Sequence, residues 1–249
     1  MVRIKRQLVL LTRVVWDFIQ GMYTFRLVAP CVTVFGSARL TDKSPAYALA
    51  HKTGMALGEN SFTVMTGGGP GLMEAASRGV RESGGKCVAC RIQLSFEQGR
   101  NHYIDLSVSF RYFFVRKVML IQHSCALVVL PGGLGTLDEV FEVMTLIQTQ
   151  KISPLPIVFV GRDYWQPLLD LVKSMVTAGT ITAGEMDRLS PLMLVTDDVS
   201  EMIAHLKAHM SHERAEPPAK RATAPSEQLA AAAKASPLEI VRTPRGDFQ

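Results

Sequence analysis

Two glycine-rich runs in this 249-residue chain have the composition of phosphate-binding turns, TGGGPGLME (residues 66–74) and PGGLGTLDE (residues 131–139). Each follows an apolar stretch and precedes a helical pattern. Glycine lets the backbone approach an anion closely, and the first N–H groups of the following helix point toward it. Neither run matches G-x-G-x-x-G, and the Walker lysine is absent, which argues against dinucleotide cofactors and ATP hydrolysis. A monophosphate ligand is compatible with both runs.

Several charged residues near these runs each have a structural and a functional interpretation. Arg116 and Lys117 lie in a helical pattern that is apolar nearly all round, so we expect that helix to be largely buried. A buried arginine keeps its charge, so we expect an ion pair, a side chain that reaches the surface, or a binding site. Glu139 follows Thr136 by three residues, which is also the spacing of a capping box. Glu74 fits either the helix dipole or contact with ribose or water.

The cysteines and histidines do not predict a metal centre. Cys87 and Cys90 form a C-x-x-C, but they lie in an apparent strand, where their side chains face opposite ways. A zinc site needs a second pair of ligands, and none has suitable spacing. We therefore interpret the cysteines as core residues, and their low number suggests the reducing cytoplasm. The six histidines form no cluster, so we expect no metal and no cofactor.

Strand-like and helix-like segments alternate along the middle of the chain. Near-continuous apolar strands separated by helices predict a single-domain α/β fold, a Rossmann-like doubly wound parallel sheet. Ligands of such sheets bind at the carboxyl ends of the strands. The predicted strands lie at about 31–37, 61–66, 86–94, 105–110, 125–130, 155–161 and 192–197. The predicted helices lie at about 46–58, 71–83, 111–124, 137–149, 164–178 and 199–210.

The two ends of the chain differ from this middle. The sequence predicts an amphipathic helix at residues 1–27, the Rossmann-like ligand-binding domain at residues 28–211, and a disordered tail rich in Ala, Pro and charges at residues 212–249. For the helix we favour packing on the body or a partner subunit over attachment to a membrane surface, and we do not expect a membrane partner. Much of the excess positive charge lies in this helix and not on the body, so nucleic acid is not an expected partner.

At PGGLGTLDE the chain resembles the LOG family of cytokinin riboside 5′-monophosphate phosphoribohydrolases, formerly labelled "lysine decarboxylase-like". The run matches the PGGxGTxxE signature, and GGGPGLMEAASRG, VFGSAR and the Arg-Lys pair of RKVM support the match over residues 31–210. The plant pattern is RKxxM, whereas Met119 comes one position earlier, which resembles the broader bacterial branch. The resemblance implies a homodimer that hydrolyses a nucleoside monophosphate to free base and ribose 5-phosphate.

The resemblance also implies roles for individual residues. Arg116 and Glu139 would be catalytic, with Lys117 close by. The 5′-phosphate would be held by the second turn, and the pocket would be completed by the end of the first strand and the first turn. Those binding residues are Gly132, Gly133, Gly135 and Thr136, then Ser37, Gly68, Gly69 and Gly71, with Glu74 as a secondary candidate.

The sequence is compatible with three other functions. A general purine or pyrimidine nucleotide nucleosidase would use the same site on other bases. A non-catalytic nucleotide or phosphoanion carrier, like the molybdenum cofactor carriers, would need the glycine turns but no carboxylate. A regulatory subunit would dock through the basic N-terminal helix. No residue is marked as the Schiff-base lysine of a decarboxylase.

Overall fold

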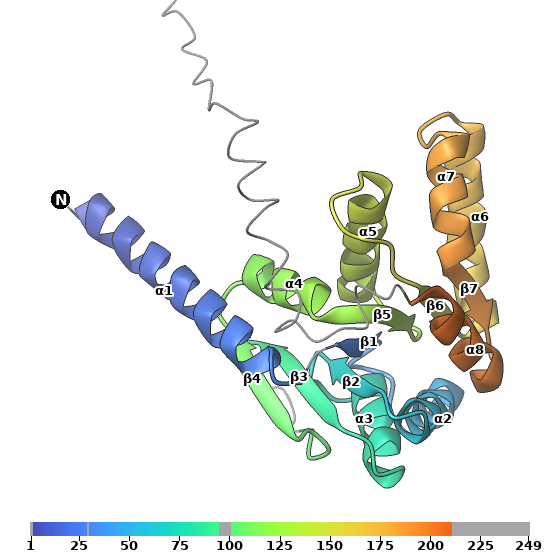
Figure 1. Ribbon diagram of the computed structural model, residues 1–249, viewed down its shortest axis with the longest axis horizontal. Coiled ribbons are helices and arrows are strands. Elements are labelled where there is room, and N and C mark those ends of the chain that lie inside the picture. The colour runs from blue at the N-terminus through green and yellow to red at the C-terminus, as the bar shows by residue number, and fades with distance from the viewer. Residues whose placement is uncertain (1, 29, 95–100, 211–249) are drawn as a thin grey trace, which may run out of the picture.

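The computed structural model describes residues 2–28, 30–94 and 101–210, which form one seven-stranded sheet (Figure 1). Its strand order is β4-β3-β2-β1-β5-β6-β7, and every neighbouring pair is parallel. The chain therefore winds outward from β1 in one direction and then, from β5, in the other. The strands are β1 (Cys31–Phe35), β2 (Thr63–Thr66), β3 (Cys87–Ile92), β4 (Leu106–Phe110), β5 (Ser124–Val129), β6 (Ile157–Val160) and β7 (Met193–Thr196).

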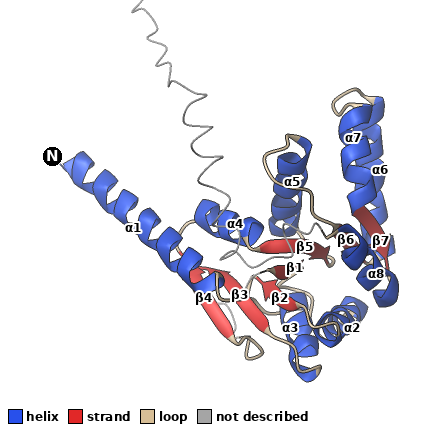
Figure 2. Cartoon of the chain, in the orientation of Figure 1, coloured by secondary structure: helices blue, strands red, loops and turns tan. Residues whose placement is uncertain are grey.

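Helices cover both faces of this sheet, as the predicted doubly wound fold requires (Figure 2). One apolar cluster joins the sheet to α1, α4, α5, α6 and α7, and a second joins it to α2, α3 and α8. Successive residues of β1 alternate between the clusters, because side chains of a strand point to opposite faces. The helices are α1 (Val2–Phe25), α2 (Pro45–Glu59), α3 (Leu72–Glu82), α4 (Phe113–Gln122), α5 (Leu134–Gln148), α6 (Arg162–Thr177), α7 (Ala183–Leu189) and α8 (Val199–His209).

The start of α5 corrects the sequence analysis. The predicted helix began at Leu137, whereas α5 begins at Leu134, with Gly133 at the N-cap and no capping side chain. Thr136 is therefore inside the first turn and cannot be an N-cap residue. The capping-box interpretation of Thr136 and Glu139 is wrong, so Glu139 needs another explanation. The structure also contains α7, which was not predicted.

Helix α4 is less buried than its composition predicted. Val115, Met119, Leu120 and Ile121 are buried against the sheet, but Phe113, Phe114 and Val118 are exposed. The expectation of a largely buried helix is wrong because the sheet and its neighbours cover only one side of α4. Helix α1 is similar, since its second half packs on the body whereas residues 4–13 are exposed.

The cysteines lie where the strand pattern placed them. The thiol of Cys87 faces Ser77 in one apolar cluster, whereas Cys90 belongs to the other cluster, so the two side chains point to opposite faces of β3. All four cysteines are buried, and burial raises the pKa of Cys87 to about 12. Such thiols pack as apolar groups. None of the helices within residues 2–28, 30–94 and 101–210 is long and apolar enough to span a membrane. The predicted tail, 212–249, lies outside the described residues.

Candidate functional site

The loops that follow β1, β2 and β5 meet at the carboxyl edge of the sheet. Ser37, just after β1, connects them through its backbone. Its N–H donates to the carbonyl of Pro131 at 2.9 Å, and its carbonyl accepts from the N–H of Leu72 at 2.9 Å. Because the winding direction changes between β1 and β5, this edge is the topological switch point, where ligands of open α/β sheets bind.

The first turn, Gly67–Gly71, is a crowded one. Gly68 and Gly71 have φ of +70° and +72°, a conformation that side chains other than glycine rarely adopt. A Cβ atom on Gly71 would lie 2.5 Å from the carbonyl oxygen of Ser37, and one on Gly69 would lie 2.7 Å from Met73. Gly68 and Gly71 are therefore required by the backbone path, and Gly71 also by the backbone packed against it, whereas the neighbour of Gly69 is the end of a flexible methionine side chain.

The second turn, Gly132–Thr136, is open on the side of its later glycines. Apart from its chain neighbours and the backbone of its own helix, a Cβ atom added at Gly133 or at Gly135 would have no atom of the described residues within 4 Å. Gly133 is the N-cap of α5, so the first N–H groups of the helix and the positive end of its dipole face this region. The hydroxyl of Tyr164 donates to the Gly132 carbonyl at 2.7 Å and holds the turn from behind. This arrangement can bind an anion.

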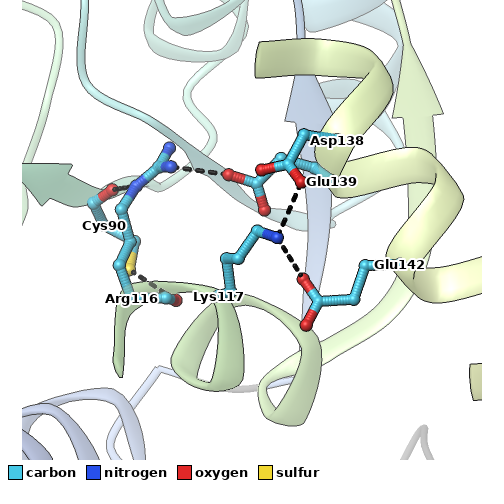
Figure 3. A network of polar contacts seen from close by, with 6 residues as sticks. All are labelled: Cys90, Arg116, Lys117, Asp138, Glu139 and Glu142. Atoms are coloured by element: carbon cyan, nitrogen blue, oxygen red, sulfur yellow. Dashed lines mark hydrogen bonds and ion pairs between the residues drawn. The ribbon is translucent and has the colours of Figure 1, made fainter. Parts of the chain in front are cut away.

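Arg116 of α4 and Glu139 of α5 form a buried ion pair beside these turns (Figure 3). Arg116 Nη1 lies 2.6 Å from Glu139 Oε1, and Arg116 Nε donates to the carbonyl of Cys90 at 2.9 Å. The side chains are 11% and 5% exposed. Glu139 Oε2 is buried and has no hydrogen-bond partner among the described residues. Arg116 thus fixes one carboxylate oxygen, and the other makes no hydrogen bond within the described part of the chain.

The charges around Glu139 have opposing effects on its pKa. Burial raises the pKa of the carboxyl group above its ordinary value, whereas Arg116 and then Lys117 lower it. Lys117 Nζ is 2.9 Å from Asp138 Oδ1 and 3.0 Å from Glu142 Oε2, as Figure 3 shows. Lys117 therefore contacts two acidic residues of α5. Its role in substrate binding stays a prediction.

Most of the predicted site residues lie together. One edge of the sheet holds the second turn, Arg116, Lys117 and Glu139. The first turn lies beside them, because a Cβ on Gly67 would be 3.0 Å from Arg116 Nη2. The Ser37 hydroxyl accepts from the N–H of Arg39 and so turns toward its own loop. Glu74 lies in the first turn of α3, at the positive end of the helix dipole.

Sequence reasoning missed several groups that shape the site. The carbonyl of Cys90, the carboxylates of Asp138 and Glu142, and the side chain of Arg91 beside Gly68 all lie here. Arg91 could have been proposed from the sequence, because it is a charged residue near the carboxyl end of an apolar strand. Within the described part of the chain, no three His, Cys, Asp or Glu side chains are grouped to hold a metal.

Comparison with known proteins gives a consistent family. A family model described as "Possible lysine decarboxylase" matches residues 73–206. The chain is 27% identical over 197 residues to a cytokinin riboside 5′-monophosphate phosphoribohydrolase of Rhodococcoides fascians, which covers 72% of this chain and 96% of that protein. It is 30% identical over 169 residues to the enzyme of the same name in Mycobacterium tuberculosis, over 64% of this chain and 87% of that protein.

A solved structure is similar in fold. The molybdenum cofactor carrier protein of Chlamydomonas reinhardtii is 23% identical, with a TM-score of 0.52, over 72% of this chain and 97% of that one. At this identity the likeness concerns the fold alone. The predicted Rossmann-like α/β sheet is therefore confirmed both by the strand order and by a solved structure.

Proposed function

The chain belongs to the possible lysine decarboxylase family, the family of the LOG phosphoribohydrolases, and from that premise we propose that it hydrolyses the N-glycosidic bond of a nucleoside 5′-monophosphate. Water adds to C1′ of the ribose as the bond to the base breaks, and the proton from water ends on the base. The products are a free base and ribose 5-phosphate. Cytokinin riboside monophosphate and AMP are the proposed substrates.

The observation that carries this proposal is the buried carboxylate of Glu139 with one unpartnered oxygen. Breaking a glycosidic bond builds positive charge on the sugar, as in the hydrolysis of O-glycosides. A carboxylate stabilises that charge or takes a proton from the attacking water. Arg116 holds Oε1 and lowers the pKa of Glu139, which burial raises, and in this proposal Glu139 acts on the ribose in its ionised form through Oε2.

The second glycine turn is the proposed phosphate site. The empty space at Gly133 and Gly135, and the N-terminus of α5 behind them, support it. Glu139 follows on the same helix, one turn after Gly135, so phosphate binding and the carboxylate share one rigid element. This spacing suits a ligand whose anionic end and reacting bond are separated by a ribose.

The first turn and Ser37 complete the pocket in this proposal, and Lys117 adds positive charge beside Glu139. The functional unit is proposed to be a homodimer in the cytoplasm, in line with the resemblance described above. The assay below identifies the base, because adenine, prenylated adenine, guanine and pyrimidine nucleotides share the ribose phosphate that these residues are proposed to contact.

A product assay tests the proposal and separates it from the carrier alternative. Purified protein is incubated separately with AMP, isopentenyladenosine monophosphate, GMP, CMP and UMP, and free base and ribose 5-phosphate are measured. We expect release from at least one purine nucleotide, and release from all five would identify a general nucleosidase. No release from any nucleotide, with AMP bound in calorimetry, would overturn the enzyme and support a carrier.

A further inference from the structure

Helix α1 exposes an apolar stripe that the body of the protein does not cover. Its members recur at spacings of four and three residues, so they share one side of the helix over about 27 Å. Each has between 47% and 62% of its surface exposed: Ile4, Leu8, Leu11, Val15, Ile19 and Met22. Most large exposed apolar side chains of the described chain belong to this helix, which marks it as an interaction surface.

Only the second half of α1 is attached to the body. Asp17 is fully buried and pairs with Arg111, Phe25 packs in the core, and a Cβ on Gly21 would overlap Met119. Residues 4–13 are exposed on all sides, and Figure 1 shows this half extending away from the sheet beyond β4. A short helix without packing is marginal in water, so a covering surface is needed to stabilise it. The expected packing on the body therefore accounts for only half of the helix.

The charges on the exposed faces of α1 are all positive. Lys5, Arg6 and Arg13 line an open groove of about 380 Å³ between α1 and Tyr112, and no acid among the described residues lines it. Asp17, the one acid of the helix, is buried. The partner that fits these charges is an anionic one.

The aromatic residues lie at the border between the apolar and polar faces. Lys5, Trp16 and Tyr23 are separated by 11 and 7 residues, close to whole numbers of turns, so they share one line along the helix beside the stripe. Trp16 and Tyr23 are 61% and 62% exposed. Aromatic rings with a polar atom and long basic side chains at this border are typical of helices that lie in a lipid headgroup region.

We propose that α1 is an interfacial helix that binds the surface of an anionic lipid membrane, with its apolar stripe in the acyl boundary and its basic residues near the headgroups. A second copy of the chain fits less well. Pairing two stripes would bring Lys5 of each helix near the other, and the exposed faces of α1 offer no carboxylate to match them. The proposal is independent of the proposed hydrolase activity.

Vesicle co-sedimentation of the full chain tests this inference. We expect binding to vesicles of phosphatidylcholine mixed with phosphatidylglycerol, no binding to phosphatidylcholine alone, and weakening by added salt. The Leu8→Gln/Leu11→Gln variant should bind at least roughly tenfold more weakly. The Arg6→Gln/Arg13→Gln variant, which keeps the apolar stripe intact, should lose roughly fivefold per residue. Leu171→Gln changes an exposed leucine on α6, outside the stripe, and this control should bind as the wild type does.

Light scattering in the absence of lipid identifies the alternative. If the wild type does not bind the anionic vesicles, the proposal is overturned, and a fall in mass caused by Leu8→Gln/Leu11→Gln would then assign the stripe to a second copy. Equal binding to neutral and anionic vesicles, unaffected by Arg6→Gln/Arg13→Gln, would also overturn it, because the positive charges would then have no role.

Discussion

The two glycine turns are similar in sequence but differ in what surrounds their glycines. In the first turn, Gly68 and Gly71 adopt positive φ, and added Cβ atoms would overlap Ala89, Arg91 or the Ser37 carbonyl. In the second turn, Gly133 and Gly135 adopt no such conformation and face empty space. The glycines of the first turn are explained by the fold, whereas these two are not.

This difference indicates where a ligand contacts the protein. A glycine that neither backbone strain nor crowding requires leaves room for something else, and at the N-terminus of α5 an anion is the chemically suitable occupant. The helix behind the open turn carries Glu139, which pairs with Arg116, whereas the helix after the crowded turn carries Glu74 in its first turn. The first turn therefore serves mainly to hold the loops of the fold in place, and the second is proposed to bind the phosphate of the substrate.

The largest expected effect on stability is that of Gly71→Ala. The strained φ alone should lower the free energy of unfolding by about 1–3 kcal/mol, and the overlap with the Ser37 carbonyl should add to this. Gly84→Ala is the matched control, because Gly84 has φ of +77° but open space around it. Urea denaturation measures both. Equal losses in the two variants would show that crowding does not distinguish the first turn.

Gly135→Ala should have the opposite profile. Alanine is favoured over glycine within a helix, so stability should be kept or should rise by about 0.5–1 kcal/mol. A methyl group in the proposed phosphate space should raise KM for the nucleotide by roughly tenfold, about 1.4 kcal/mol of binding. Gly184→Ala, an equally open position at the start of α7, should alter stability alone. An unchanged KM in Gly135→Ala would show that the phosphate does not bind at the second turn.

A smaller effect is expected in the pH dependence of the reaction. Burial raises the pKa of Glu139, so a carboxylate role predicts that kcat/KM falls as pH decreases through a value above the ordinary glutamate range. Lys117→Gln removes a charge that lowers this pKa, so the acid limb should move to higher pH. Lys173→Gln, a largely exposed lysine on α6, should leave the limb in place. A shift to lower pH would contradict the assigned electrostatics.

Much of the fold could be predicted from the sequence because buried parallel strands are continuous apolar runs and glycine turns end them. The start of α5 could not, because Gly133 caps the helix without a side-chain signal and Leu134, which follows, is 85% exposed. The burial of α4 and α1 could not be predicted either, since an apolar side chain does not tell which neighbour covers it. The contact between Arg116 and Glu139 could not be predicted either, because the two residues lie on different helices and a local sequence pattern does not show which helices meet.

The central claim, that Glu139 acts on the ribose and does not merely stabilise α5, is tested most directly by the Glu139→Gln variant. Its rate of ribose 5-phosphate release from the preferred nucleotide is compared with the wild type, with nucleotide affinity from calorimetry and stability from urea denaturation. We predict a rate lower by roughly 10²–10⁴-fold with affinity largely retained. Glu59→Gln, at an exposed position on α2, is the control. A folded Glu139→Gln protein that turns over at the wild-type rate would contradict the account.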